Sequence, residues 1–167
     1  MEKIASFQID HLRLKPGLYV SRKDRFGSKE SAAKAAAEVT LTTFDLRFKE
    51  PNKEPVIDQS TLHTIEHLGA TFIRSHNEWA ERTVYFGPMG CRTGFYLILE
   101  GDLSSEDILP VIRQMLEWIS TFDGIIPGAT AAECGNWQEQ NLEMAKWEVR
   151  RYASLMKNPG KENHEYP

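Results

Sequence analysis

The sequence contains little cysteine and no long apolar run. Only two cysteines, Cys91 and Cys134, occur in 167 residues, too few for the disulfide framework of a small secreted protein. No segment approaches the ~20 apolar residues of a membrane-spanning helix. The first ten residues, MEKIASFQID, also lack the apolar core of a signal peptide. We therefore expect a soluble, cytoplasmic protein with two reduced thiols and no membrane partner.

An excess of positive charge is also absent. The 20 Lys and Arg residues against 24 Asp and Glu residues give a formal net charge of −4. Binding to nucleic acid relies on a basic surface, so we expect no nucleic-acid partner. The chain has no internal repeat, and its length suits one compact domain spanning residues 1–167. An Ala-rich stretch at 28–38 has a composition that leaves its conformation open.

Hydrophobic patterning predicts both strands and helices. In the run VTLTTFDLRF, strict alternation puts Phe44, Leu46 and Phe48 on one face of a strand and Asp45 and Arg47 on the other. We therefore expect Arg47 on an exposed polar face. Strands are expected at 39–48, 83–86 and 93–99, and helices at 58–77, 104–122 and 137–156. This order lacks regular β-α-β alternation, which predicts an α+β fold with an antiparallel sheet covered by helices.

The main motif, H-x-x-E-H, lies in the predicted helix 58–77 and consists of His63, Glu66 and His67. Helical spacing of i and i+4 places the two imidazoles on one face, as two ligands of a metal ion require. Glu66 leans toward the same side, where it can exchange protons without being a ligand. The alternative is an ordinary helix with a salt-bridged glutamate and two hydrogen-bonded histidines.

A catalytic metal site needs a third protein ligand and one open position. Cys134, in the turn-like sequence E-C-G-N, offers a thiolate for this role. Two imidazoles and one thiolate suit zinc or ferrous iron, whereas magnesium and calcium prefer oxygen ligands. The residue pattern does not choose between Zn(II) and Fe(II).

Three short motifs carry a resemblance to a known family. They read H-T-I-E-H at 63–67, P-M-G-C at 88–91 and E-C-G-N at 133–136. Their order and spacing resemble the S-ribosylhomocysteine lyase family, which makes the precursor of autoinducer-2. The runs S-F-Q-I-D-H at 6–11 and F-D-L-R-F at 44–48 extend the resemblance over nearly the whole chain.

The resemblance implies a homodimer of α+β subunits with two active sites at the subunit interface. Each site would hold one divalent metal, Fe(II) in the native enzyme or Zn(II). The substrate, S-ribosylhomocysteine, would open to its aldehyde, and metal-assisted proton transfers would move the carbonyl along the ribose. Elimination would then release homocysteine and leave 4,5-dihydroxy-2,3-pentanedione.

The resemblance also assigns roles to individual side chains. Cys91 and Glu66 would move protons, which fits a carbonyl migration that needs a Lewis acid and bases on both sides of the carbon chain. Ser6, His11 and Arg47 would lie in the substrate pocket, with Arg47 holding the amino acid carboxylate or the ribose hydroxyls. Without the resemblance, these three are as well explained as a turn residue, a packed loop histidine and a surface ion pair.

Three features of the sequence depart from the family pattern. The segment 85–87 reads Y-F-G where many relatives have an Asp, an aliphatic residue and a Ser, and Gln140 stands where relatives often have His. The stretch 28–38 is also longer than in the usual pattern. We expect neither Gln140 nor this longer stretch to touch a metal ligand or a proton-transfer residue, whereas the departure at 85–87 removes an Asp that could contact the substrate.

Other functions remain open from the residues alone. A peptide deformylase would use H-E-x-x-H with its cysteine upstream of the helix, and inverzincin proteases take a downstream acidic third ligand. A purely structural metal site would need a fourth ligand, for which Cys91 is the only candidate.

Overall fold

The computed structural model describes residues 3–27 and 38–167, so nearly all of the stretch 28–38 lies outside the described residues. The elements, in chain order, are α1 (Ala5–Gln8), β1 (Gly17–Phe26), β2 (Val39–Arg47), α2 (Gln59–Arg74), β3 (Thr83–Pro88), β4 (Gly94–Glu100), α3 (Ser105–Thr121), α4 (Leu142–Met156) and the 3₁₀ turn η1 (Lys161–Asn163).

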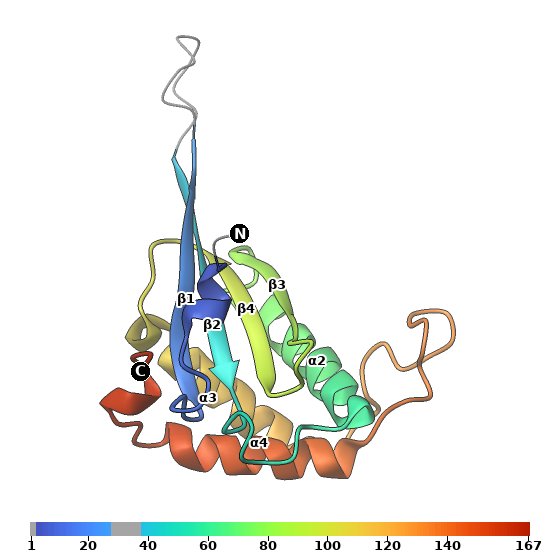
Figure 1. Cartoon of the computed structure of the whole chain (residues 1–167). Coiled ribbons are helices and arrows are strands. Elements are labelled where there is room, and N and C mark those ends of the chain that lie inside the picture. The colour runs from blue at the N-terminus through green and yellow to red at the C-terminus, as the bar shows by residue number, and fades with distance from the viewer. Residues whose placement is uncertain (1–2, 28–37) are drawn as a thin grey trace.

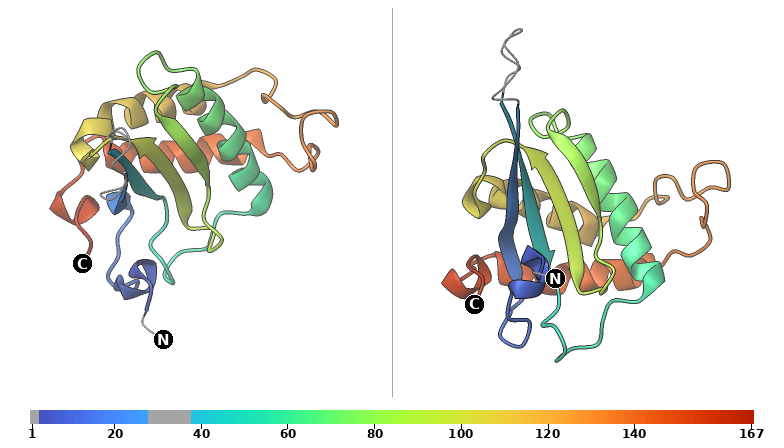
Figure 2. Two further views of the ribbon diagram at one scale, coloured as in Figure 1. Left: turned by 90° about the horizontal axis from the view of Figure 1, so that it is seen from above. Right: turned by 45° about the horizontal axis from the view of Figure 1, so that its top comes forward.

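The strands form one antiparallel sheet in the order β1-β2-β4-β3. Helices α2, α3 and α4 cover one face of this sheet, and the short helix α1 lies against the opposite, outer face (Figures 1 and 2). The predicted α+β fold with a helix-covered antiparallel sheet is therefore confirmed. None of the helices in the described part of the chain has the length and apolarity needed to cross a membrane.

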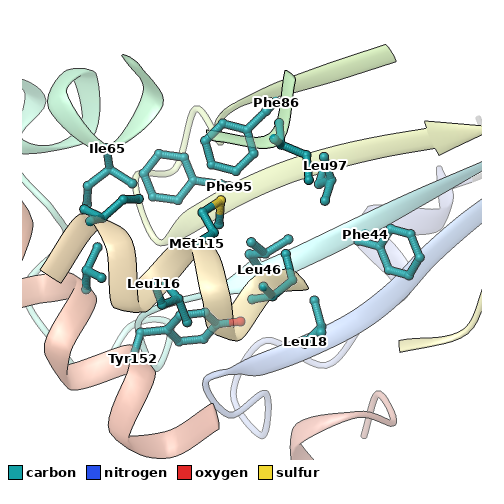
Figure 3. Close-up of a cluster of buried hydrophobic side chains, with 14 of the residues drawn as sticks. Leu18, Phe44, Leu46, Ile65, Phe86, Phe95, Leu97, Met115, Leu116 and Tyr152 are labelled. Carbon is teal, nitrogen blue, oxygen red and sulfur yellow. The ribbon is translucent and has the colours of Figure 1, made fainter. Parts of the chain in front are cut away.

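The core lies between the sheet and helices α2 to α4. Alternate residues of β2 and β4, including Phe44, Leu46, Phe95 and Leu97, point toward the helices and are fully buried. Figure 3 shows these side chains together with the ring of Tyr152 from α4. The predicted inward face of the 39–48 segment is confirmed. Because α2 packs one side on this core, its other side is left to carry polar residues.

Asp58 caps α2 and fixes where the helix begins. Its carboxylate accepts hydrogen bonds from the Thr61 backbone N–H at 3.0 Å and from the hydroxyls of Ser60 and Thr61, both at 2.6 Å. The bond from Thr61 satisfies one of the backbone N–H groups that the first helical turn leaves without partners, and the two hydroxyl bonds hold the Asp58 carboxylate in place. The start of the helix in turn sets the direction in which the H-x-x-E-H residues point.

Replacing the helix cap is expected to weaken the fold in a pH-dependent way. We expect Asp58→Ala to lower the free energy of unfolding by about 1 kcal/mol at neutral pH, the usual cost of losing an N-cap. Burial alone would raise the pKa of Asp58, but the hydrogen bonds from Ser60 and Thr61 outweigh it and hold this pKa below its usual value. The stabilisation is therefore complete above the ordinary carboxyl pKa and is lost as the pH falls through the lowered folded-state pKa.

Urea unfolding at neutral and acidic pH measures this effect. The difference in the free energy of unfolding between wild type and Asp58→Ala should become smaller at acidic pH. Asp58→Asn serves as the control, because asparagine also caps helices but does not titrate. If the difference in the free energy of unfolding between wild type and Asp58→Ala stays constant with pH, the charge of Asp58 contributes nothing to stability.

Several predicted boundaries differ from the structure. The last helix begins at Leu142 rather than at residue 137, because Asn141 caps it by accepting from the Met144 N–H at 3.2 Å. The residues before Asn141 form turns that pack against α2. Helix α2 ends at Arg74, short of residue 77, and strand β1 was not predicted.

Candidate metal centre and catalytic site

Two histidines and one cysteine form a compact cluster at the exposed side of α2. One ligand atom from each of His63, His67 and Cys134 lies within 4.8 Å of the others, and all three residues are half-buried. The Cys134 Sγ is 3.3 Å from the His63 Nε2, and the two imidazole rings are nearly perpendicular at a centroid distance of 4.5 Å. The structure thus brings together the three residues expected from the sequence as metal ligands.

Backbone carbonyls fix the protonation of both imidazoles. The Nδ1 of His63 is 2.9 Å from the Glu139 carbonyl oxygen, and the Nδ1 of His67 is 2.6 Å from the Pro127 carbonyl oxygen. A carbonyl oxygen only accepts, so each Nδ1 carries a proton and donates it. The Nε2 atoms are then the ring nitrogens available to bind a metal, which is the usual arrangement of histidine ligands.

The segment between α3 and α4 supplies the cysteine and both carbonyls. It extends alongside α2 in Figures 1 and 2, where it is drawn in orange. The Cys134 N–H donates to the Thr130 carbonyl at 3.0 Å, and the Asn136 N–H lies 3.4 Å from the Cys134 sulfur. Gly128 has φ of 71°, and a Cβ there would lie 3.1 Å from the His67 Nδ1. A side chain at position 128 would therefore strain the backbone and crowd the imidazole.

Gln140 supports one of the histidines, which corrects an expectation from the sequence. Its Oε1 lies 2.8 Å from the Thr64 Oγ1, and its Nε2 lies 3.2 Å from the His63 Nδ1. Because the Nδ1 proton is donated to the Glu139 carbonyl, Gln140 restrains the imidazole by packing against it rather than by a hydrogen bond. The expectation that this departure from the family pattern touches no metal-site residue is wrong. The turns before Asn141, which the sequence assigned to a helix, are what bring Gln140 against α2.

Loss of this support is expected to weaken metal binding. Gln140→Ala should reduce the affinity for Zn(II) by roughly tenfold, since partners that orient a ligating histidine typically contribute 10–100-fold. Gln138→Ala, at a neighbouring exposed position, is the matched control and should bind normally. Competition with a zinc-sensitive dye measures both affinities, and equal values for the two variants would contradict the supporting role.

Glu66 shares a hollow with His63, one residue of the metal cluster. This hollow has a volume of about 570 Å³, within the range of pockets for small ligands. It is lined by Gln59, Leu62, His63, Glu66, Pro88, Met89, Gly90, Arg92, Asn136 and Glu139. A carboxylate and a metal-ligating histidine therefore face the same space, as a reaction that combines a Lewis acid with proton transfer requires.

Cys91 is exposed in the turn between β3 and β4 and contacts a different set of residues. Its Sγ lies 3.1 Å from the Thr93 Oγ1 and 3.9 Å from the Arg47 Nη1. The same Nη1 donates to the Thr93 Oγ1 at 2.6 Å. The thiol therefore has a cation and a hydroxyl as neighbours.

Arg47 is buried, which corrects the prediction of an exposed side chain. It points to the outer face of the sheet as expected, but only 3% of its surface is exposed. Asp45, on the same face, accepts from its Nε at 3.1 Å and from its Nη2 at 2.5 Å. Burial alone would lower the pKa of Arg47, but the charge and hydrogen bonds of Asp45 outweigh it and raise that pKa, so the guanidinium stays charged. The ion pair considered from the sequence exists, but inside the protein.

Ser6 and His11 lie away from the metal cluster within one chain. Ser6 lines a separate hollow over the outer face of the sheet, together with Tyr85 and Tyr96. The Nδ1 of His11 is 2.8 Å from the Ile9 carbonyl oxygen, and the residue lies on the same side of the sheet as Asp45. The structure thus groups Glu66 with the metal cluster, Arg47 with Cys91, and Ser6 with neither.

Comparison with known proteins places these residues in a family. Residues 4–163 match the family model described as S-ribosylhomocysteinase (LuxS). The chain belongs to the LuxS family. It is similar to the S-ribosylhomocysteine lyase of Clostridium acetobutylicum, with 53% identity over 100% of this chain and 99% of that protein. The lyases of Desulfotalea psychrophila and Borreliella burgdorferi are 52% and 49% identical, over 100% of this chain and 99% and 100% of those proteins.

The LuxS family match confirms the resemblance that the three motifs carried. It also confirms the expected enzyme class, because the relatives are named S-ribosylhomocysteine lyase. The matched range includes both hollows and the Cys91 turn but ends at residue 163. The last residues of the chain therefore lie outside the part matched to the LuxS family model.

Some residues around the site were missed by sequence reasoning. Asp45 and Thr93 hold Arg47, and Gly128 leaves room for His67. A signal for Asp45 was present, because residues two apart on a strand share a face and Arg47 stands two positions later. Gly128 follows Pro127 in a P-G pair, which marks a turn but gives no indication of what the turn approaches.

Proposed function

We propose that this protein is a metal-dependent S-ribosylhomocysteine lyase that forms homocysteine and 4,5-dihydroxy-2,3-pentanedione. The observation that carries the proposal is the cluster of His63, His67 and Cys134, together with the hollow that His63 shares with Glu66. The names of the relatives supply the substrate. Carbonyl migration followed by elimination of a thiol needs a Lewis acid and two proton-transfer groups, and the site offers candidates for all three.

The ligand set suits a resident divalent metal. Two imidazole nitrogens and one thiolate favour Zn(II) or Fe(II), and we propose Fe(II) as the native ion. When bound, the metal polarises the carbonyl and hydroxyl oxygens of the opened sugar. The Nδ1 hydrogen bonds of His63 and His67 orient the rings and leave their Nε2 atoms available as ligands.

Glu66 and Cys91 divide the proton transfers in this proposal. Glu66 accepts a proton from one carbon and returns it to another, and it assists the final elimination. Cys91 acts as the second base in the earlier steps, next to the permanent charge of Arg47. Neither side chain forms a covalent bond to the substrate, so each regenerates by returning its proton.

Arg47, Ser6 and His11 are proposed to line the substrate pocket. Arg47 is held by Asp45 and Thr93, which favours a role as a fixed positive charge beside Cys91 over a mobile clamp on a carboxylate. Ser6 and His11 lie toward the outer face of the sheet, where they can meet the ribose or the amino acid part of the substrate. Tyr85 lines the Ser6 hollow, so the departure at 85–87 falls in this proposed pocket.

We further propose a homodimer whose active sites lie at the subunit interface. The outer face carries large exposed side chains, with Ile4 59% and Phe7 70% exposed on and beside α1. Burial of such a surface against a second copy is favourable. In one chain, Ser6 does not share a hollow with Glu66, and a partner subunit would allow the two to meet.

Mixing two impaired variants tests the shared site. If Ser6 serves the partner subunit's Glu66, hybrid dimers of Ser6→Ala and Glu66→Gln contain one intact site. The refolded or exchanged mixture should then release homocysteine faster than the mean of the two parent variants. A mixture that matches this mean, or a monomer in sedimentation experiments, would contradict the interfacial site.

A cytoplasmic location follows from the same proposal. Cys91 and Cys134 must both remain reduced to act as a base and as a ligand, and the cytosol maintains free thiols. A purely structural metal site is less well supported, because Cys91 contacts Arg47 and Thr93 and does not belong to the cluster found in the described residues.

Product analysis tests the proposed reaction. Fe(II)-loaded protein is incubated anaerobically with S-ribosylhomocysteine, and the products are treated with o-phenylenediamine, which traps adjacent carbonyls. We expect homocysteine and the trapped dicarbonyl in equal amounts, and neither product after chelation of the metal. Release of ribose instead of a dicarbonyl would show hydrolysis and overturn the proposal.

A further inference from the structure

The charge of Arg47 is held by a carboxylate that also contacts the C-terminal segment. Asp45 is 1% exposed and accepts two hydrogen bonds from Arg47. The Tyr166 hydroxyl donates a third at 3.0 Å, to the same Oδ2 that accepts from the Arg47 Nη2. With Nε and Nη2 occupied by Asp45, the Nη1 of Arg47 is directed to Thr93 and Cys91.

Several contacts fix the C-terminal segment at the start of β1. The ring of Tyr166 stacks on that of Tyr19 at a centroid distance of 4.7 Å and an interplanar angle of 12°. Asn163 donates from its side chain to the Pro16 carbonyl at 2.7 Å, and the Tyr19 hydroxyl lies 2.8 Å from the Glu162 carbonyl oxygen. Figure 1 shows the C-terminus beside β1, where these contacts lie. The position of the Tyr166 hydroxyl is therefore well defined.

We propose that Tyr166 and Asp45 are positioning residues that orient Arg47 toward Cys91. The proposal rests on the proton-transfer role proposed above for Cys91. Tyr166 restricts rotation of the Asp45 carboxylate, the carboxylate holds two donors of the guanidinium, and the third donor then faces Thr93 and the thiol. Through this chain of contacts, the C-terminus of the protein sets how reactive Cys91 is.

The charged groups near Cys91 are consistent with this series of contacts from Tyr166 through Asp45 and Arg47 to Cys91. Arg47 on β2 and Tyr96 on β4 both lie close enough to Cys91 for a charge there to raise their pKa, and Asp45 contacts Arg47 directly. Burial raises the pKa of Tyr166, so its hydroxyl remains a donor over the working pH range. Burial also raises the pKa of Asp45, and the contacts with Arg47 and Tyr166 oppose this rise.

The test measures the reactivity of Cys91 directly. Metal-loaded protein is treated with iodoacetamide over a series of pH values, and peptide mass spectrometry follows the alkylation of Cys91 separately from Cys134. Tyr166→Phe retains the aromatic ring and the net charge but loses the hydroxyl. We expect it to alkylate between about two- and tenfold more slowly at neutral pH, the effect of one hydrogen bond, and to show a profile displaced to higher pH.

Tyr152→Phe is the matched control. Its hydroxyl donates to the Gly17 carbonyl at 2.7 Å and does not bond to Asp45. This variant loses a buried hydrogen bond, so it reports any general effect of lower stability. An unchanged profile for Tyr166→Phe, or an equal displacement in Tyr152→Phe, would overturn the positioning role.

Asp45→Asn separates positioning from charge by the sign of its effect. Removing a nearby negative charge would by itself favour the thiolate and speed alkylation. A positioning role predicts slower alkylation, because Arg47 is no longer held. Faster alkylation therefore contradicts the proposal, and Tyr166→Phe gives the decisive result if Asp45→Asn does not fold. The two proposals can fail separately, because the alkylation profiles do not depend on turnover. If the wild type releases no homocysteine, the lyase function is refuted but the positioning role of Tyr166 is not.

Discussion

Glu66→Gln is expected to bind its metal normally and to release homocysteine at least about a hundredfold more slowly than the wild type, since general acid–base catalysis contributes about 10²–10⁴. Glutamine has nearly the same shape as glutamate but does not accept a proton at neutral pH. Because Glu66 lies beside His63 in the same hollow without belonging to the metal cluster, the ligand set stays intact.

Two measurements are needed for this variant. Metal content per chain should equal that of the wild type, and the rate of thiol release should fall. Glu78→Gln, at an exposed position after α2, is the control for loss of a carboxylate elsewhere and should be fully active. Full activity of Glu66→Gln would refute the proton-transfer role, and loss of metal would make Glu66 a ligand instead.

Cys134→Ala is expected to lose most of its metal affinity. A structural zinc site contributes roughly 10–16 kcal/mol of binding free energy, so removing one of its ligands should weaken binding by at least about a hundredfold. Cys91→Ala is the matched control, because it removes the other thiol of the chain, which lies outside the cluster. Dialysis followed by metal analysis should find about one equivalent in Cys91→Ala and little in Cys134→Ala. The reverse result would exchange the roles of the two cysteines.

The metal cluster was predictable from the sequence for local reasons. Helical spacing alone places His63 and His67 on one face, and a capping aspartate precedes the helix at the right distance. The only uncertainty was how Cys134, far along the chain, reaches them. The structure supplies the answer in the turns of the 122–141 segment, which have no periodicity for sequence reasoning to detect.

The burial of Arg47 was not predictable from its strand. Alternation correctly put it on the face opposite the core, but the pattern carries no information about what covers that face. The cover includes Tyr166, whose hydroxyl meets Asp45 across more than a hundred residues of sequence. For the same reason, the helix expected from residue 137 was wrong, since contacts with α2 hold the residues before Asn141 in turns.

Strand β1 illustrates a further limit of patterning. Its first residues, Gly17 to Tyr19, are buried, whereas its second half is mostly charged and exposed. The charged half pairs with the first half of β2 through backbone hydrogen bonds, which depend little on side-chain type. No alternation of apolar and polar residues marks such a ribbon.

The central claim is that a metal centre and the Cys91 thiol act together to cleave a carbon–sulfur bond. The most direct measurement follows homocysteine with a thiol reagent during anaerobic incubation of Fe(II)-loaded protein with S-ribosylhomocysteine, for wild type and Cys91→Ala side by side. The account predicts release by the wild type and none by a Cys91→Ala variant with the same metal content. No release by metal-loaded wild type, or equal release by both proteins, would contradict it.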